Sequence, residues 1–329
     1  MPCYRPLPGL DTGAIRVDTQ KRIIKILPRS AWHDYNYKTD QLVRKPYMTI
    51  PCGQCIGCRL QRSLHWAVRC QHEASLYQNN CFITLTYNNQ HLPQGGTLIK
   101  ADFQKFMKRL RKCYGEGIRY YMCGEYGSEY SRPHYHALLF NFNFSDREYW
   151  KRSGSGEKLY VSQNLDKLWT KPETGKSMGY SSIGNATFES AAYVARYITK
   201  KKFGEQALTA YTDFDPWTGE ILCERLPEYN TMSRRPGIAA GWFDQNFNDV
   251  YSGDFVLRKK KDGTLIKMSP PKFYDSRYEL TDPEDLKKIK ENRKNNAAKH
   301  KDNNTFDRLA IREEIQEIKA KQLIRSYEK

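Results

Sequence analysis

Residues 132–140, Arg-Pro-His-Tyr-His-Ala-Leu-Leu-Phe, constrain this chain most, because a His-x-His pair runs directly into an apolar segment. Side chains alternate along a β-strand with a period of two, so His134 and His136 share one face of the predicted strand and Tyr135 lies on the other. The apolar residues 137–140 are expected to be its buried continuation. Two imidazoles on one face can bind a metal ion together, although a bare His-x-His pair is also common at an ordinary strand end. The neighbouring segments therefore determine whether this pair is a metal site or an ordinary strand end.

The net charge of the chain points to a polyanionic partner. Its 54 Lys and Arg residues against 37 Asp and Glu residues give a net charge of +17. Nucleic acid is the leading candidate and an acidic membrane surface is the second. The 23 tyrosines could stack on unpaired bases, although a basic surface over an aromatic core has the same composition. No run of about eighteen apolar residues is present, so no membrane span is expected. The first residues lack the apolar segment of a signal peptide, which favours a cytoplasmic protein.

A cluster of cysteines lies in residues 51–59, where Cys52, Cys55 and Cys58 form two overlapping Cys-x-x-Cys steps. The glycines between them permit turns that direct several thiolates at one ion, as in a zinc knuckle. Nine cysteines without an export signal favour reduced thiols or a metal site over disulfides. Unligated cysteines in a turn are the alternative. The candidates for the fourth ligand of a tetrahedral site are Cys3, Cys70, His65 and His72.

The segments around the histidines predict a mixed α and β core. Alternating β-branched and aromatic residues predict a strand at 81–87, and an amphipathic pattern predicts a helix at 100–111. A second strand is expected at 118–123, and its spacing suggests an antiparallel hairpin with the histidine strand. Such a hairpin would bring Glu125 within reach of the histidines as a third metal ligand. A lone glutamate in a turn is otherwise more often an ordinary surface residue.

An alanine-rich segment at residues 188–202 predicts a helix that ends in lysines, which suit the negative end of the helix dipole. Tyr193 and Tyr197 are four residues apart and therefore share one face. Lys200 and Lys201 follow about one turn later. Two tyrosines on such a helix could simply fill core grooves. Beside a metal-bound phosphate, however, a tyrosine oxygen could attack phosphorus, and a second tyrosine would allow a second attack.

Four segments are expected along the chain. A knuckle and a helix occupy residues 1–75, and the core occupies residues 76–205 with a polar insertion at about 141–186. Residues 206–280 form a basic extension. Residues 281–329 form a charged helical tail that could pack on the body, bind nucleic acid or self-associate.

The order of these motifs resembles the HUH endonuclease superfamily, and specifically the replication initiation proteins of the Microviridae, of the gokushovirus type. The likeness rests on residues 81–87, 132–140 and 193–201, with further similarity at 51–59 and 233–238. It covers roughly residues 50 to 275, and the set of three motifs in this order is far more specific than any one of them.

The resemblance implies an α+β fold with a central antiparallel sheet of about five strands flanked by helices. It implies that His134 and His136 hold Mg²⁺ or Mn²⁺, whereas Glu125 as the third ligand is inferred from its position. The residues implied in catalysis are Tyr193, Tyr197, Lys200 and Lys201. The candidate zinc ligands are Cys52, Cys55, Cys58 and Cys3. The candidate DNA-binding residues are Arg132, Arg196, Arg234 and Arg235.

A protein of this kind would initiate rolling-circle replication in the cytoplasm of a bacterial host. It would nick one strand at the phage origin, remain joined to the 5′ phosphate through tyrosine, and later rejoin the strand. Its partners would be single-stranded DNA, the double-stranded replicative form and a host polymerase. A host helicase would also be needed, because the chain has no phosphate-loop motif. The alternatives are a non-catalytic, zinc-containing nucleic-acid-binding protein and a related HUH transposase or relaxase. Relaxases usually carry a third histidine and single-tyrosine transposases lack the second tyrosine, so both fit this chain less well.

Overall fold

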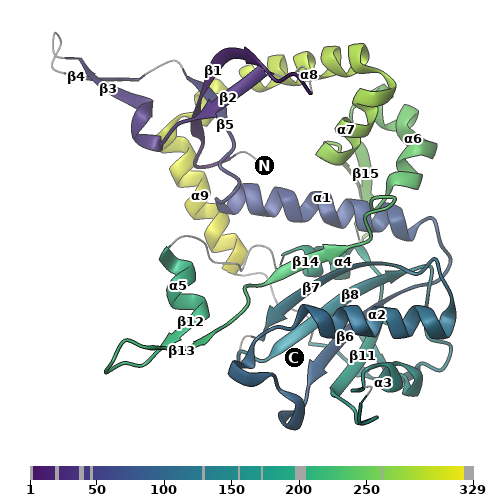
Figure 1. Cartoon of the computed structure of the whole chain (residues 1–329). Helices are drawn as coiled ribbons and strands as arrows, with labels where there is room; N and C mark the ends of the chain where they lie inside the picture. Colours follow the sequence, from purple (N-terminus) through teal and green to yellow (C-terminus); the bar gives the residue numbers. More distant parts are fainter. Residues whose placement is uncertain are drawn as a thin grey trace. The chain divides into compact units, whose positions relative to one another are not determined.

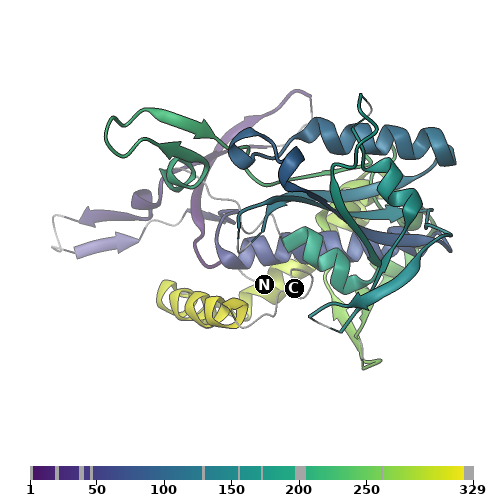
Figure 2. The same cartoon turned by 90° about the horizontal axis from the view of Figure 1, so that it is seen from below.

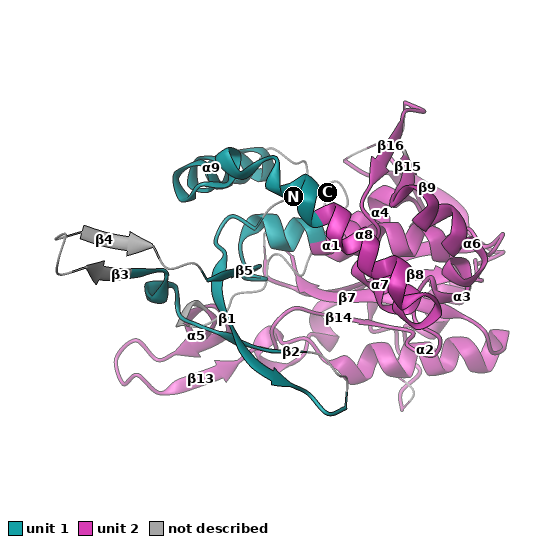
Figure 3. Cartoon of the chain, turned by 90° about the horizontal axis from the view of Figure 1, so that it is seen from above, with its two compact units in different colours: residues 1–61, 294–323 teal, residues 62–293, 324–329 magenta. Residues whose placement is uncertain are grey.

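A computed structural model describes most of the chain, in two compact units (Figure 3). The smaller unit comprises residues 1–61 and 294–323, and the larger unit comprises residues 62–293 and 324–329. The described residues are 3–18, 22–36, 41–44, 47–127, 130–154, 156–171, 173–196, 205–260 and 262–321.

The larger unit is built on a seven-stranded antiparallel sheet with the strand order β14-β7-β8-β6-β11-β10-β9. Figure 1 labels β14, β7, β8, β6 and β11 of this sheet. The sheet places the histidine strand β8 between β7 and β6, with long uninterrupted pairing on both sides. The strands are β6 (Asn80–Tyr87), β7 (Arg119–Tyr126), β8 (Pro133–Phe140), β9 (Glu148–Arg152), β10 (Lys158–Val161), β11 (Gly179–Asn185) and β14 (Tyr229–Met232).

The expected α+β class is confirmed, but the sheet has seven strands where about five were expected. The difference arises mainly in residues 141–186, which the polar composition marked as an insertion. These residues contain β9, β10, α3 and β11, and β11 pairs with β6 along its whole length. Strand β14 adds the opposite edge through its pairing with β7.

Helices cover both faces of the sheet, so both faces are buried (Figure 2). Along β8, the side chains of Tyr135, Ala137 and Leu139 join the core under α2, whereas Leu138 and Phe140 join the core under α1 and α4. By the period of two, His134 and His136 belong to the α1 and α4 face. The residue ranges of α1 and α8 extend across the boundary between the two units. The helices of the larger unit are α1 (Ile56–Ala74), α2 (Lys100–Tyr114), α3 (Gln163–Leu168), α4 (Phe188–Arg196), α5 (Glu205–Tyr211), α6 (Ala240–Gly253), α7 (Lys272–Thr281) and α8 (Pro283–Ala298).

Two short hairpins complete the larger unit. They are formed by β12 (Thr212–Phe214) with β13 (Ile221–Glu224) and by β15 (Val256–Lys259) with β16 (Leu265–Met268). Among the described residues, no helix is long and apolar enough to span a membrane.

The smaller unit joins the two ends of the chain. Its three-stranded sheet has the order β2-β1-β5, and β3 pairs with β4 in a separate hairpin. Arg5 forms an ion pair of 2.5 Å with Glu313 of the C-terminal helix, and the ring of Phe306 contacts Trp32 edge-on. The C-terminal helix therefore packs on the N-terminal segment of its own unit. The elements are β1 (Leu7–Ile15), β2 (Arg22–Ile26), β3 (His33–Asn36), β4 (Gln41–Arg44), β5 (Met48–Ile50) and α9 (Phe306–Lys321).

Candidate active site and metal centres

The two histidines of β8 lie opposite two threonines of β6. Antiparallel pairing sets Thr86 against His134 and Thr84 against His136. Each threonine hydroxyl is 2.9 Å from the Nδ1 atom of its histidine. A hydroxyl can donate or accept, so it can hold the imidazole ring in either tautomer. The orientation of both rings is therefore set by side chains of the neighbouring strand.

Glu125 reaches the same face from the other neighbour, β7, where it pairs in register with His134. Its side chain is fully buried, and its Oε1 atom lies 2.7 Å from Nε2 of His136, itself only 3% exposed. A carboxylate and a ring nitrogen at this distance need a proton or a cation between them. The hairpin expected from the sequence is thus present, and it brings Glu125 to His136.

Gly127 leaves room beside the ring of His134. A Cβ atom added to Gly127 would lie 2.7 Å from Nε2 of His134, closer than nonbonded contacts allow. Gly127, Thr84 and Thr86 are not among the site residues predicted from the sequence. A usable signal was present for the threonines, because Thr-x-Thr in β6 has the same period as His-x-His in β8.

Tyr193 is held against His136 by α4, which packs on β7 and β8. The start of α4 is capped reciprocally, because Ser190 N–H donates to Thr187 Oγ1 at 3.2 Å and Thr187 N–H donates to Ser190 Oγ at 2.8 Å. Tyr193 is 3% exposed, and its ring meets the His136 ring edge-on at 5.2 Å between centroids. The other three predicted catalytic residues, Tyr197, Lys200 and Lys201, lie outside the described residues.

The four arginines expected to bind DNA differ in their surroundings. Arg132 is half-buried, and its guanidinium donates to the carbonyl of Tyr87 and to Asn89 at the end of β6. Arg196 is half-buried at the end of α4. Arg234 and Arg235 are exposed and follow β14, near the start of β7.

The donor set of the histidine site suits the expected ions. Imidazole nitrogen is accepted by Mn²⁺, and the Glu125 carboxylate supplies the oxygen that Mg²⁺ and Mn²⁺ prefer. With Nδ1–H donated to the threonine hydroxyl, Nε2 keeps a lone pair toward the site, which is the usual arrangement behind a ligating histidine. His134, His136 and Glu125 therefore supply the types of donor atom that Mn²⁺ accepts, although these atoms are more widely spaced than those of the cysteine cluster.

The cysteines form a more compact group in the smaller unit. Within the described ranges, only the Sγ atoms of Cys3, Cys52, Cys55 and Cys58 make a set of three or more His, Cys, Asp or Glu donors within 4.8 Å of one another. Cys3 is thus the fourth member. The other candidates belong to the larger unit, where Cys70 lies in the core and His72 bonds the Tyr274 hydroxyl at 2.7 Å.

Backbone amides surround these sulfur atoms. The N–H of Cys52 donates to Cys3 Sγ at 3.2 Å, and the N–H of Tyr4 donates to Cys55 Sγ at 3.3 Å. Burial alone would raise the pKa of Cys55, but hydrogen bonds from the amides of Cys58, Tyr4 and Arg5 and from the Cys58 thiol together outweigh it and lower that pKa to about 7. Burial raises the pKa of Cys58 to about 11. Four converging sulfurs with amide donors could bind a metal such as zinc.

A family model for replication-associated protein ORF2/G2P matches residues 80–202, the segment that carries β6, β7, β8 and α4. Replication-associated protein ORF2 of Spiroplasma virus 4 is 33% identical over 240 residues, which are 70% of this chain and 68% of that protein. Replication-associated protein VP4 of Bdellovibrio phage phiMH2K is 32% identical over 294 residues, 86% of this chain and 79% of that protein. Replication-associated protein ORF4 of Chlamydia phage 1 is 33% identical over 161 residues, 46% of this chain and 38% of that protein. No solved structure matches the chain.

The family model that matches residues 80–202 describes a class of replication-associated proteins. The chain belongs to the family of phage replication-associated proteins represented by those of Spiroplasma virus 4 and phage phiMH2K. The resemblance to the Microviridae initiators stated from the sequence is confirmed at the level of this family.

Proposed function

We propose that this protein initiates rolling-circle replication of a single-stranded DNA phage by nicking and rejoining DNA through a phosphotyrosine intermediate. One observation carries the proposal: the ring of Tyr193 contacts His136, which in turn contacts the buried carboxylate of Glu125. A nucleophile, an imidazole pair and a carboxylate thus meet on one face of the sheet.

In the proposed reaction, the Tyr193 oxygen attacks the scissile phosphorus and the bond to the 3′ oxygen breaks. The product is a 5′-phosphotyrosine ester and a free 3′ hydroxyl, which a host polymerase could extend. Mg²⁺ or Mn²⁺ held by His134, His136 and Glu125 would act as a Lewis acid toward the phosphate oxygens. Thr84 and Thr86 orient the two imidazoles through Nδ1.

Tyr193 is buried in the conformation described here, so DNA reaches its hydroxyl only after a local rearrangement near α4. Tyr197 as the nucleophile of the second cut, with Lys200 and Lys201 neutralising phosphate charge, is carried over from the family resemblance. Their positions in the motif support these roles, together with a site of action at the phage origin in the host cell.

We also propose that Cys3, Cys52, Cys55 and Cys58 hold a structural zinc ion. The four sulfur atoms come from the N-terminal segment and from the start of α1, so one ion would tie these two parts of the smaller unit together. Structural sites of this kind are closed by four protein ligands and contribute to folding.

The test is covalent capture of DNA. A labelled single-stranded oligonucleotide from the phage origin is incubated with protein in Mn²⁺ or in EDTA, and the products are separated on a denaturing gel. We expect a metal-dependent protein–DNA band that disappears in His136→Ala and in the double variant Tyr193→Phe with Tyr197→Phe. Loss in one single tyrosine variant would identify the residue that makes the first cut.

The matched control is Tyr180→Phe, which changes an exposed tyrosine of β11 and should leave the band unchanged. Tight binding without metal-dependent cleavage of any origin-derived substrate would contradict the nicking reaction. That result would favour the non-catalytic, zinc-containing DNA-binding protein.

A further inference from the structure

Residues 233–239, here called the arginine loop, connect β14 to α6 in the larger unit. Its first residue continues the sheet, because Ser233 N–H donates to the carbonyl of Tyr120 at 3.0 Å. In return the N–H of Tyr120 donates to Ser233 Oγ at 3.1 Å. The loop therefore begins at a fixed position beside the start of β7.

A buried charged pair holds the far part of the loop. Glu73 of α1, whose side chain is 2% exposed, accepts from the guanidinium of Arg119 and from the N–H of Ala239. The second nitrogen of Arg119 donates to the carbonyl of Pro236 at 2.9 Å. One carboxylate and one guanidinium thus bind the loop backbone at two places.

A second arginine of α1 adds a third attachment. Arg69 donates two hydrogen bonds to the carbonyl of Ile238, at 3.2 and 3.0 Å. Its guanidinium is stacked between the rings of Trp66 and Phe273, 4.0 and 3.8 Å from their centroids. The loop backbone is therefore fixed by polar groups that are themselves held by packing.

Arg234 and Arg235 project from this fixed backbone into solvent. In the part of the chain that the structure describes, neither guanidinium forms an ion pair. A rigid loop that presents two unpaired guanidinium groups is suited to bind phosphate, because little backbone entropy is lost on binding.

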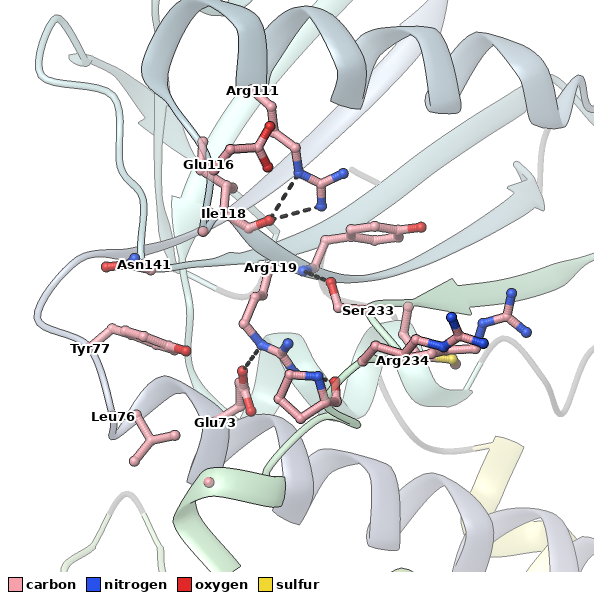
Figure 4. Close-up of a pocket in the computed structure, with 16 residues that line it drawn as sticks. Glu73, Leu76, Tyr77, Arg111, Glu116, Ile118, Arg119, Asn141, Ser233 and Arg234 are labelled. Carbon is pink, nitrogen blue, oxygen red and sulfur yellow. Dashed lines mark hydrogen bonds and ion pairs between the residues drawn. The ribbon is translucent and has the colours of Figure 1, made fainter.

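A pocket of about 650 Å³ adjoins the loop (Figure 4). Its volume lies within the range of roughly 300–1,000 Å³ usual for small-ligand sites. Arg111 lines it with its guanidinium fixed on the carbonyl of Ile118, and Tyr77 projects into it from the segment after α1. Gly241, in the first turn of α6, also lines it, and a helix N-terminus favours an anion.

The charge balance of this pocket is positive. Glu73 and Arg119 neutralise each other at its base. The remaining charged side chains of the lining are three arginines, Arg111, Arg234 and Arg235, and one acid, Glu116. The half-buried Tyr77 ring supplies an aromatic surface beside them.

We propose that this pocket binds one nucleotide of the single-stranded DNA, with phosphate on the arginine loop and the unpaired base on Tyr77. The inference rests on the proposed function. Arg119 and Glu125 are six residues apart on β7, so they face the same side of the sheet, roughly 20 Å from each other. Tyr121 and Cys123 lie between them on this face and are buried, so a strand that occupies the pocket passes outside the covered sheet before a phosphate further along reaches Tyr193.

The test measures binding of a fluorescein-labelled oligodeoxythymidine to the full chain by anisotropy, in EDTA, over a series of salt concentrations. Each phosphate contact contributes about 0.7 to the slope of log affinity against log salt for single strands. Arg234→Ala with Arg235→Ala removes the contact to this one phosphate and should therefore lower the slope by about 0.7, and the double lysine variant at the same positions should keep it. The matched control is Lys287→Ala with Lys288→Ala, two exposed lysines of α8, and it should leave the slope unchanged.

Tyr77→Ala should weaken binding about tenfold at fixed salt, whereas Tyr77→Phe keeps the ring and the affinity. A wild-type slope in the double alanine variant, or a loss no larger than that of the lysine control, would overturn the proposed subsite. The covalent-capture assay is read separately. Metal-dependent adducts with an unchanged slope would refute the pocket alone, and a lowered slope without adducts would refute only the nicking chemistry.

Discussion

Replacing Glu73 by glutamine should destabilise the protein strongly, although the two side chains have almost the same shape. Glu73 is 1% exposed and accepts from two donors, the Arg119 guanidinium and the Ala239 amide. The Arg119 side chain is itself only 13% exposed, so water cannot replace the lost carboxylate. Removing one partner of such a pair typically costs about 3–5 kcal/mol. Glutamine keeps one acceptor oxygen, which places the expected loss near the lower limit, about 3 kcal/mol.

The measurement is urea unfolding of the wild type, Glu73→Gln, Arg119→Met and the double variant. The double-mutant cycle should give a coupling energy of about 2 kcal/mol, because the second substitution removes the charge that the first one leaves unpaired. The matched control is Glu279→Gln, in an ion pair of 3.2 Å with Lys290 whose side chains are 33% and 50% exposed. Its effect should stay within about 0.5 kcal/mol. A loss below about 1 kcal/mol for Glu73→Gln, or strict additivity in the cycle, would refute the reasoning.

Burial lowers the pKa of His72 to about 4, whereas the pKa of the same side chain in the unfolded chain is about 6.5. Between these two pH values the unfolded chain therefore binds more protons than the folded chain. The contribution of His72 to stability is therefore complete above pH 6.5 and falls by roughly 3 kcal/mol toward pH 4. An NMR titration that gives His72 a pKa near 6.5 in the folded protein would contradict this. Gly127→Ala should push the His134 ring aside. We expect calorimetry to show an affinity for Mn²⁺ that is lower by at least about tenfold, because displacing a metal ligand weakens binding. An unchanged affinity would argue against His134 as a ligand. Purified protein should carry one zinc ion per chain. Cys3→Ser should lower both the zinc content and the melting temperature, whereas Cys113→Ser, at an exposed cysteine, should change neither. Equal zinc content in the two variants would show that Cys3 is not a zinc ligand.

Local periodicity was sufficient for the elements that carry the histidine site. The alternation of residues 132–140, the helical spacing around Tyr193 and the short connection between β7 and β8 are all short-range features. A hairpin register follows from its turn, which is why Glu125 could be expected beside the histidines. The strand partners were harder to foresee, since Thr84 and Thr86 lie about fifty residues before the histidines they hold.

Polar composition concealed part of the sheet. Strand β9 is exposed along its whole length, so it lacks the buried alternation that identifies a strand in a sequence. Strand β11 was also hidden, because Gly179, Ser181 and Ser182 are poor strand formers and pairing with β6 compensates for their low propensity.

The sequence by itself determined the order of the motifs, the face shared by His134 and His136, and thereby the family. Only the tertiary structure decided which distant groups meet: Cys3 with Cys55, and Glu73 with the arginine loop. The physical reason is that periodicity and turn geometry act over a few residues, whereas these contacts close long segments of chain. Their closure is decided by the packing of whole elements, which no local pattern encodes.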